Sequence, residues 1–103
     1  MKNATLVYRP PKTRKYQRIA MGPRQLAMLE CLRTHDCSRL DLLAWGRPWL
    51  ALSAPQTVAS LRRKGLVVES TMETARNAEG AAVRFARYGL KGSVVRVEPG
   101  RHA

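Results

Sequence analysis

Acidic residues are scarce in this chain of 103 residues, which has seven Asp and Glu against nineteen Lys and Arg. The formal net charge of +12 attracts polyanions well beyond contact distance, so nucleic acid is the leading class of partner. The few acids are scattered, and the closeness of His35, Asp36 and Ser38 in the sequence does not create a catalytic triad. A phosphate-binding loop and a dinucleotide fingerprint are missing as well. We therefore expect no enzymatic activity and no cofactor.

Long apolar runs are also missing from the sequence. No stretch approaches the roughly 20 apolar residues of a membrane-spanning helix, and no charged n-region followed by an apolar h-region resembles a signal peptide. We expect a cytoplasmic protein without membrane contact, in which a single core buries about two thirds of the unfolded surface. Its expected parts are a basic N-terminal arm (1–22), a main domain (23–90) and a C-terminal strand or tail (91–103).

The sequence has only two cysteines, Cys31 and Cys37, six positions apart. This spacing fits neither a disulfide scaffold nor a CxxC redox motif, so we expect reduced, partly buried thiols. Cys31, His35 and Cys37 are also close enough to bind zinc, with Asp36 or His102 as a fourth ligand. Structural zinc sites usually have a second ligand pair at recognisable spacing, so we predict no metal site. Redox sensing through the two thiols stays open.

The most informative segment of the chain is SAPQTVASLRRKGLVVES, in its middle. Ser53 followed three residues later by Gln56 is typical of a capping box, and Pro55 suits the first turn of a helix. Gly65 follows three consecutive cations. The last turn of a helix favours positive charge, and a glycine commonly ends a helix. The pattern predicts a basic helix over about 54–64 that runs directly into a strand.

The two faces of this helix differ in chemistry. At about 100° per residue, Ala54, Val58 and Leu61 share one face and should belong to the core. The opposite face has side chains that can read base edges in a major groove: Gln56, Ala59, Ser60 and Arg63. Flanking side chains suit contacts to the DNA backbone: Ser53, Thr57, Arg62 and Lys64. The alternative is an ordinary amphipathic surface helix with solvated arginines.

The N-terminal 22 residues contain six cations and no acid. Residues 4–8 have the composition of a short strand, whereas the following PPKTRKYQR should be extended or mobile. The segment is either a disordered tail or an arm that follows phosphates or a minor groove. In the second case its backbone contacts would be Lys12, Arg14, Lys15 and Arg18.

Two further helices are predicted before the basic one. The first spans about 23–34 and should bury Leu26, Leu29 and Leu32, with Ala27 and Cys31 beside them.

The second predicted helix begins after Ser38, which with Asp41 forms a capping box, and it ends at Gly46. Its inward side chains should be Leu40, Leu43 and Ala44. Trp45 and Trp49 follow, and we expect their bulk to pack between the second and third helices and fix the angle between them.

After the basic helix, residues 66–72 and 83–88 should form a β-hairpin. The polar segment between them, with Arg76 and Asn77, suits a tip that contacts a DNA backbone or minor groove. Residues 93–98 alternate Val with polar residues. They could add a third strand to the hairpin, or pair with the N-terminal strand in the same or another chain.

This order of elements is that of a winged helix-turn-helix domain, and residues 23–90 resemble the MarR-type and ArsR-type bacterial regulators. TVASLRRKGLVV is similar to the recognition helix of that family and its step into the wing, and VRFARYGLKG is similar to the returning wing strand. The resemblance implies an α+β fold with a three-helix core and a C-terminal β-hairpin wing. It also implies groove-facing residues and wing residues: Gln56, Thr57, Ala59, Ser60 and Arg63 in the groove, and Arg76, Arg84 and Arg87 on the wing. The long terminal helices through which MarR-type proteins dimerise have no counterpart here.

The sequence thus predicts a transcription regulator that binds double-stranded DNA as a homodimer. An RNA-binding or ribosome-associated protein would be equally basic, although the single Phe, two Trp and three Tyr are few for a surface that stacks single-stranded bases. A winged helix that binds another protein is the second alternative.

Overall fold

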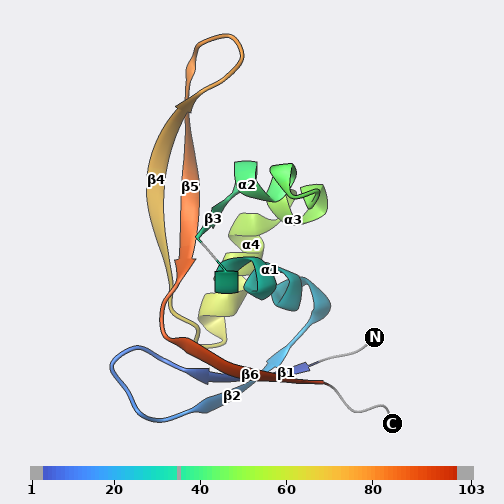
Figure 1. The fold of residues 1–103 in the computed structure, drawn as a ribbon, viewed down its shortest axis with the longest axis vertical. Helices are drawn as coiled ribbons and strands as arrows, with labels where there is room; N and C mark the ends of the chain where they lie inside the picture. Colours follow the sequence, from blue (N-terminus) through green and yellow to red (C-terminus); the bar gives the residue numbers. More distant parts are fainter. Residues whose placement is uncertain (1–3, 35, 100–103) are drawn as a thin grey trace.

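Two antiparallel sheets and a layer of helices make up the protein in our computed structural model, which describes residues 4–34 and 36–99 (Figure 1). The elements in chain order are β1 (Ala4–Arg9), β2 (Gln17–Met21), α1 (Pro23–Thr34), β3 (Cys37–Ser38), α2 (Arg39–Ala44), α3 (Pro48–Leu52), α4 (Ala54–Arg63), β4 (Val68–Arg76), β5 (Ala82–Leu90) and β6 (Ser93–Pro99). The predicted α+β class is confirmed. The arrangement is richer than a three-helix core with one hairpin, because the described residues form four helices and two three-stranded sheets.

The N-terminal segment forms the centre of one of these sheets rather than a free arm. β1 lies between β2 and β6, and it pairs with both in antiparallel fashion. The short strand expected at residues 4–8 is confirmed, and β6 pairs with it within the same chain. Residues 10–18 were expected to be extended or mobile, and the last two of them belong to β2, which begins at Gln17. Ile19 and Met21 explain this strand, since they alternate with exposed residues and bury their side chains in the core.

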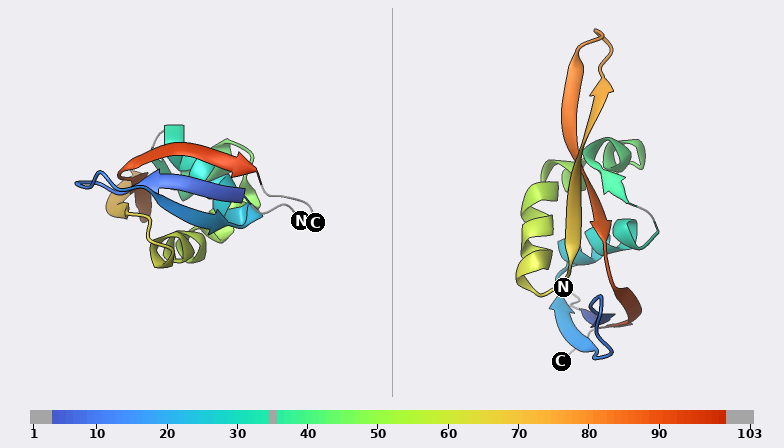
Figure 2. Two further views of the ribbon diagram at one scale, coloured as in Figure 1. Left: turned by 90° about the horizontal axis from the view of Figure 1, so that it is seen from below. Right: turned by 90° about the vertical axis from the view of Figure 1, so that its left-hand side faces the viewer.

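The second sheet contains the predicted hairpin. β4 and β5 pair from Val68↔Leu90 to Arg76↔Ala82, and their far end projects beyond the helices (Figures 1 and 2). The two-residue strand β3 adds to the other edge of β5, opposite Tyr88 and Arg87. This short strand ties the base of the hairpin to the start of α2.

Helices α1 and α4 supply much of the core, largely as their sequence patterns predict. Ala54, Val58 and Leu61 of α4 are almost fully buried, as expected. In α1, Leu29, Cys31 and Leu32 are buried, whereas Leu26 and Ala27 are half-buried. Met28 is fully buried although the sequence pattern did not single it out.

The orientation predicted for α2 is wrong. Leu40, Leu43 and Ala44 are exposed, and the buried side chain of this helix is Leu42. The cause is the predicted capping box, which is present: the Ser38 Oγ accepts a hydrogen bond from the Asp41 amide, and the Ser38 amide donates to the Asp41 carboxylate. Because Ser38 is also held in β3, the cap sets the phase of the helix and turns Leu42 inward.

Candidate nucleic-acid interface

The helix predicted over about 54–64 is present as α4, and its start differs from the expected capping box. Ser53 ends α3 and begins α4, and its hydroxyl donates a 3.0 Å hydrogen bond back to the Trp49 carbonyl. No side chain caps α4, so the Ser53–Gln56 capping box is wrong. The reason is the short helix α3, which the sequence did not predict and which occupies the Ser53 hydroxyl. Pro55 lies in the first turn of α4 as expected.

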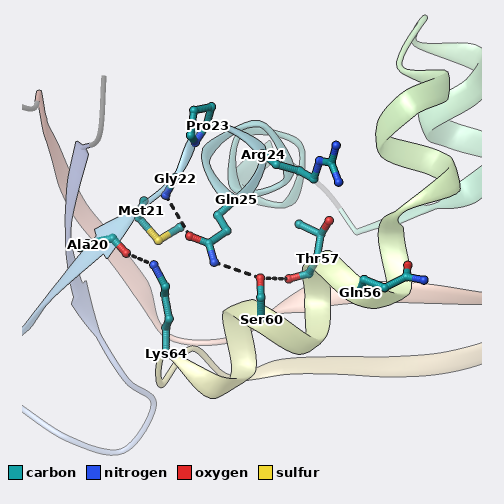
Figure 3. A pocket seen from close by; sticks show the side chains of 10 residues that line it. All are labelled: Ala20, Met21, Gly22, Pro23, Arg24, Gln25, Gln56, Thr57, Ser60 and Lys64. Atoms are coloured by element: carbon teal, nitrogen blue, oxygen red, sulfur yellow. Dashed lines mark hydrogen bonds between the residues drawn. The ribbon is translucent and has the colours of Figure 1, made fainter. Parts of the chain in front are cut away.

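The side chains predicted to read bases differ in their exposure. Gln56 and Arg63 are exposed, whereas Ala59 and Ser60 are half-buried. Ser60 lies against α1, where the Gln25 Nε2 donates a 3.0 Å hydrogen bond to its hydroxyl (Figure 3). The Ser60 hydroxyl itself donates to the Thr57 carbonyl at 2.8 Å. The hydroxyl donor of Ser60 and one of its two acceptor lone pairs are therefore used inside the protein.

Thr57, predicted to contact the DNA backbone, is only 3% exposed. Its hydroxyl donates a 2.9 Å hydrogen bond to the Ser53 carbonyl, one turn earlier in the helix. A buried side chain with an internal partner is not available to a phosphate, so Thr57 acts here as a core residue of α4.

A groove of about 580 Å³ runs along the α1 side of α4. Its walls are the end of β2 and the first turn of α1, and its lining residues are Ala20, Met21, Gly22, Pro23, Arg24, Gln25, Gln56, Thr57, Ser60 and Lys64 (Figure 3). This lining contains two cations and no acid. The Lys64 ammonium donates to the Ala20 carbonyl, which holds the positive charge at the β2 end of the groove.

Three arginines predicted as backbone contacts are engaged within the protein. Arg62 donates from Nε and Nη2 to the Val68 carbonyl, at 2.9 and 2.8 Å. Arg18 forms an ion pair of 2.5 Å with Glu98. These contacts hold both guanidinium groups to neighbouring strands.

Arg87 is the most heavily engaged of the three. Its guanidinium pairs with Glu73 at 2.5 Å and with Asp41 at 2.9 Å, and so joins the hairpin to the cap of α2. The hydrogen bond to Glu73, followed by the nearby charges of Asp41 and Glu73, raises the pKa of Arg87 above its ordinary value. Its charge is largely balanced by these two carboxylates.

Other predicted contact residues are exposed, and no side-chain hydrogen bond or ion pair holds them within the described part of the chain. They are Lys12, Arg14 and Lys15 in the β1–β2 loop, Arg63 on α4 and Arg84 on β5. Arg76, near the tip of the hairpin, is also exposed and donates to the Gly80 carbonyl at 2.8 Å.

Sequence reasoning missed Arg24 and Gln25, which lie in the first turn of α1 and line the groove beside α4. Gln25 accepts a hydrogen bond from the Gly22 amide and donates to Ser60, so it links the start of one helix to the surface of another. The Pro23 signal locates the start of α1, but no local pattern shows which side of α4 it approaches. That contact joins residues 35 positions apart.

Both cysteines are buried in the core, more completely than the partial burial expected from the sequence. Burial is the main cause that raises the pKa of the Cys37 thiol to about 12, and burial also raises that of Cys31. Within residues 4–34 and 36–99, no three His, Cys, Asp or Glu side chains are grouped to hold a metal ion. His35 and His102, two of the zinc ligands considered, lie outside the described residues. Over the same ranges, no helix is both long and apolar enough to cross a membrane.

Comparison of the chain with protein-family models, with curated proteins and with solved structures found no match. What this surface binds is therefore inferred from its own residues.

Proposed function

We propose that the protein is a cytoplasmic transcription regulator of the winged helix-turn-helix type, which binds double-stranded DNA with α4 in the major groove. The observation that carries the proposal is that Gln56 and Arg63 are both exposed on the same helix. Val58 and Leu61 fix this helix to the core. Gln can pair bidentately with adenine and Arg with guanine. A helix that is packed firmly on the core holds these side chains in a defined orientation toward the bases.

The surroundings of α4 support an anionic ligand. Asp and Glu are absent from β1, β2 and α4 and from the first turn of α1, whereas Lys and Arg occur in all four. These four elements therefore offer cations to a duplex and contain no carboxylate of their own, although Arg18 is already paired with Glu98 of β6. Release of counterions from the phosphates of the duplex would supply much of the affinity.

The hairpin after α4 supports the role of a wing. β4 and β5 follow the basic helix and extend past the helices, with Arg76 and Arg84 on the projecting part (Figure 1). The β3 strand and the Arg87 ion pairs anchor its base. We propose Arg76 and Arg84 as wing contacts to the DNA backbone, and Arg87 as the residue that positions the wing.

We propose the exposed Gln56 and Arg63 as the residues that read bases, with Ala59 as an apolar contact to a thymine methyl. We expect Ser60 to contact a base only if that base replaces Gln25 as its hydrogen-bond partner. Backbone contacts come from the β1–β2 loop through Lys12, Arg14 and Lys15. Because one such helix reads a short site, we propose that two protomers bind a palindromic operator.

The test is selection of bound fragments from a library of random duplexes, repeated at several salt concentrations. We expect one palindromic motif to be enriched, and log affinity to fall with log salt with a slope of about −0.9 for each phosphate contact. If no sequence motif is enriched, the protein binds polyanions without sequence specificity. Stronger competition by structured RNA than by random duplex would favour the RNA-binding alternative.

A further inference from the structure

Large apolar side chains cover the outer faces of α2 and α3. Their exposed fractions are 51% for Leu40, 50% for Leu43, 42% for Trp45, 45% for Trp49 and 72% for Leu52. Both tryptophans of the chain are in this set. The two tryptophans were expected to pack between the second and third helices, whereas each keeps more than two fifths of its surface exposed.

These side chains lie on two neighbouring helices and on the turn between them. Leu40 and Leu43 are three residues apart on α2, and Trp49 and Leu52 are three apart on α3, so each pair shares a helix face. α2 and α3 lie side by side, with Trp45 in the turn between them (Figure 1). We call this set of five side chains the α2–α3 surface.

The fold does not require these residues to be apolar on the outside. Leu42 and Leu50 already anchor the two helices in the core, and both are fully buried. Burying an apolar side chain stabilises a protein, so five partly exposed apolar groups could still stabilise a complex if a partner covered them. Single exposed apolar residues are normal on a protein, but a contiguous group indicates an interaction site.

The rim of the α2–α3 surface is positive. Arg39 begins α2 and Arg47 precedes α3, and both are exposed. Neither guanidinium has an ion pair or a side-chain hydrogen bond among the described residues. The acid nearest in sequence, Asp41, is already held by Ser38 and Arg87.

We propose that the α2–α3 surface docks an acidic amphipathic segment of another protein. Its apolar side chains would pack on Trp49 and Leu52 and their neighbours, and its carboxylates would face Arg39 and Arg47. Trp and Arg are the residue types that most often dominate binding energy at protein interfaces. The complementary charge of the rim sets which partners can approach.

A second copy of this chain fits the surface poorly. A two-fold contact would bring the Arg39 and Arg47 side chains of both copies into one interface. Each copy also has a net charge of +12, and the surface offers no free carboxylate to balance it. The occupant must supply the negative charge itself.

The experiment selects peptides from a random display library against the wild-type protein, with counter-selection against a Trp49→Ala/Leu52→Gln variant. We expect selected peptides to combine acidic and apolar residues and to change the fluorescence of Trp45 and Trp49. Binding of a selected peptide should weaken about tenfold or more in the Leu52→Gln variant and in an Arg39→Glu/Arg47→Glu variant. Met72→Gln is the matched control, because Met72 is 57% exposed but lies on β4. Circular dichroism verifies that each variant is folded.

Three outcomes would overturn the proposal. The library could yield no convergent peptide, or its winners could be neutral or basic. The winners could instead bind the Leu52→Gln variant as well as wild type, which would show attraction by net charge alone. A mass that doubles with concentration and returns to one protomer in the Leu52→Gln variant would assign the surface to a second copy. None of these measurements involves DNA, so the proposal stands or falls separately from duplex binding.

Discussion

The phenolic oxygen of Tyr8 lies 2.5 Å from the carbonyl oxygen of Lys91, to which it donates a hydrogen bond. The same oxygen accepts a 3.2 Å hydrogen bond from the Val67 amide. Tyr8 is fully buried in β1, whereas Val67 precedes β4 and Lys91 follows β5. One hydroxyl therefore joins the β2–β1–β6 sheet to the base of the hairpin.

Tyr8→Phe should destabilise the protein, because it keeps the ring and leaves the Val67 amide and the Lys91 carbonyl without this partner. The expected loss in the free energy of unfolding is about 1 to 3 kcal/mol, measured by urea denaturation. Tyr16→Phe is the matched control, since Tyr16 is 60% exposed, and its effect should stay within about 0.5 kcal/mol. Equal stability of the two variants would contradict the structural role of Tyr8.

The two serines predicted as helix caps should respond differently to replacement by alanine. Ser38 caps α2, so Ser38→Ala should lower the free energy of unfolding by about 1 kcal/mol. Ser53 makes no side-chain cap on α4, so Ser53→Ala should cost less, through loss of an exposed bond to Trp49. Urea denaturation of both variants measures the difference. If Ser53→Ala lowers the free energy of unfolding more than Ser38→Ala does, Ser53 caps α4 after all, as its spacing from Gln56 suggested.

Local signals in the sequence located most elements but not their neighbours. The Pro23 start of α1, the Ser38–Asp41 cap and the amphipathic pattern of α4 depend on residues a few positions apart, and all three are present. The contact of Gln25 with Ser60 depends on how α1 crosses α4, which no short window encodes. For this reason α4 itself was predicted, while the groove beside it was not.

Burial on short helices was the second weakness of sequence reasoning. Leu40 and Leu43 read as core residues because apolar side chains usually turn inward, yet both are about half exposed. A helix of six residues such as α2 has too few turns for periodicity to define its inner face. If a partner covers this surface, the apolar pattern was informative about binding rather than about folding.

The Asp41 carboxyl should make stability depend on pH in the acid range. Burial alone would raise the pKa of Asp41, but hydrogen bonds from Ser38 and the adjacent Arg87 outweigh it, and the pKa falls below its ordinary value of 3.8. A carboxyl with a lower pKa in the folded state contributes stability that is fully present above the unfolded value. This contribution is lost as the pH falls through the folded value.

We therefore expect the free energy of unfolding of the wild type to fall more steeply below about pH 4 than that of Asp41→Asn. Urea denaturation at a series of pH values from 7 to 2 measures both slopes. Parallel curves for the two proteins would show that Asp41 titrates alike in the folded and unfolded states.

The two thiols should be unreactive in the native protein. Burial, and then the proximity of Cys31, raises the pKa of Cys37 to about 12, so its thiolate is rare at neutral pH. We expect both thiols to react with an aromatic disulfide reagent at pH 8 only as fast as the fold opens. Urea-denatured protein, the control, should react at once. If the native protein releases one equivalent of the aromatic thiolate at once, one thiol is accessible. Redox sensing would then be open again.

Adjacent arginines on α4 offer a matched test of stability against DNA binding. Arg62 donates two hydrogen bonds to the Val68 carbonyl, whereas Arg63 is exposed and makes no side-chain hydrogen bond within the described ranges. Arg62→Ala should therefore lower the free energy of unfolding by about 1 kcal/mol, since its pairing is partly solvent-screened. Arg63→Ala should leave stability within about 0.5 kcal/mol of wild type.

In binding to the duplex selected from the random library, Arg63→Ala should have the larger effect, the reverse of the order expected for stability. Arg63→Ala should weaken binding by about 1 to 3 kcal/mol and relax preference at one base pair, because a bidentate contact to guanine is lost. Arg62→Ala should weaken specific and random duplexes by similar, smaller amounts, since its guanidinium is committed to β4. Fluorescence anisotropy on both duplexes measures the comparison. If Arg63→Ala weakens specific and random duplexes equally, Arg63 does not read a base and α4 is not the reading helix.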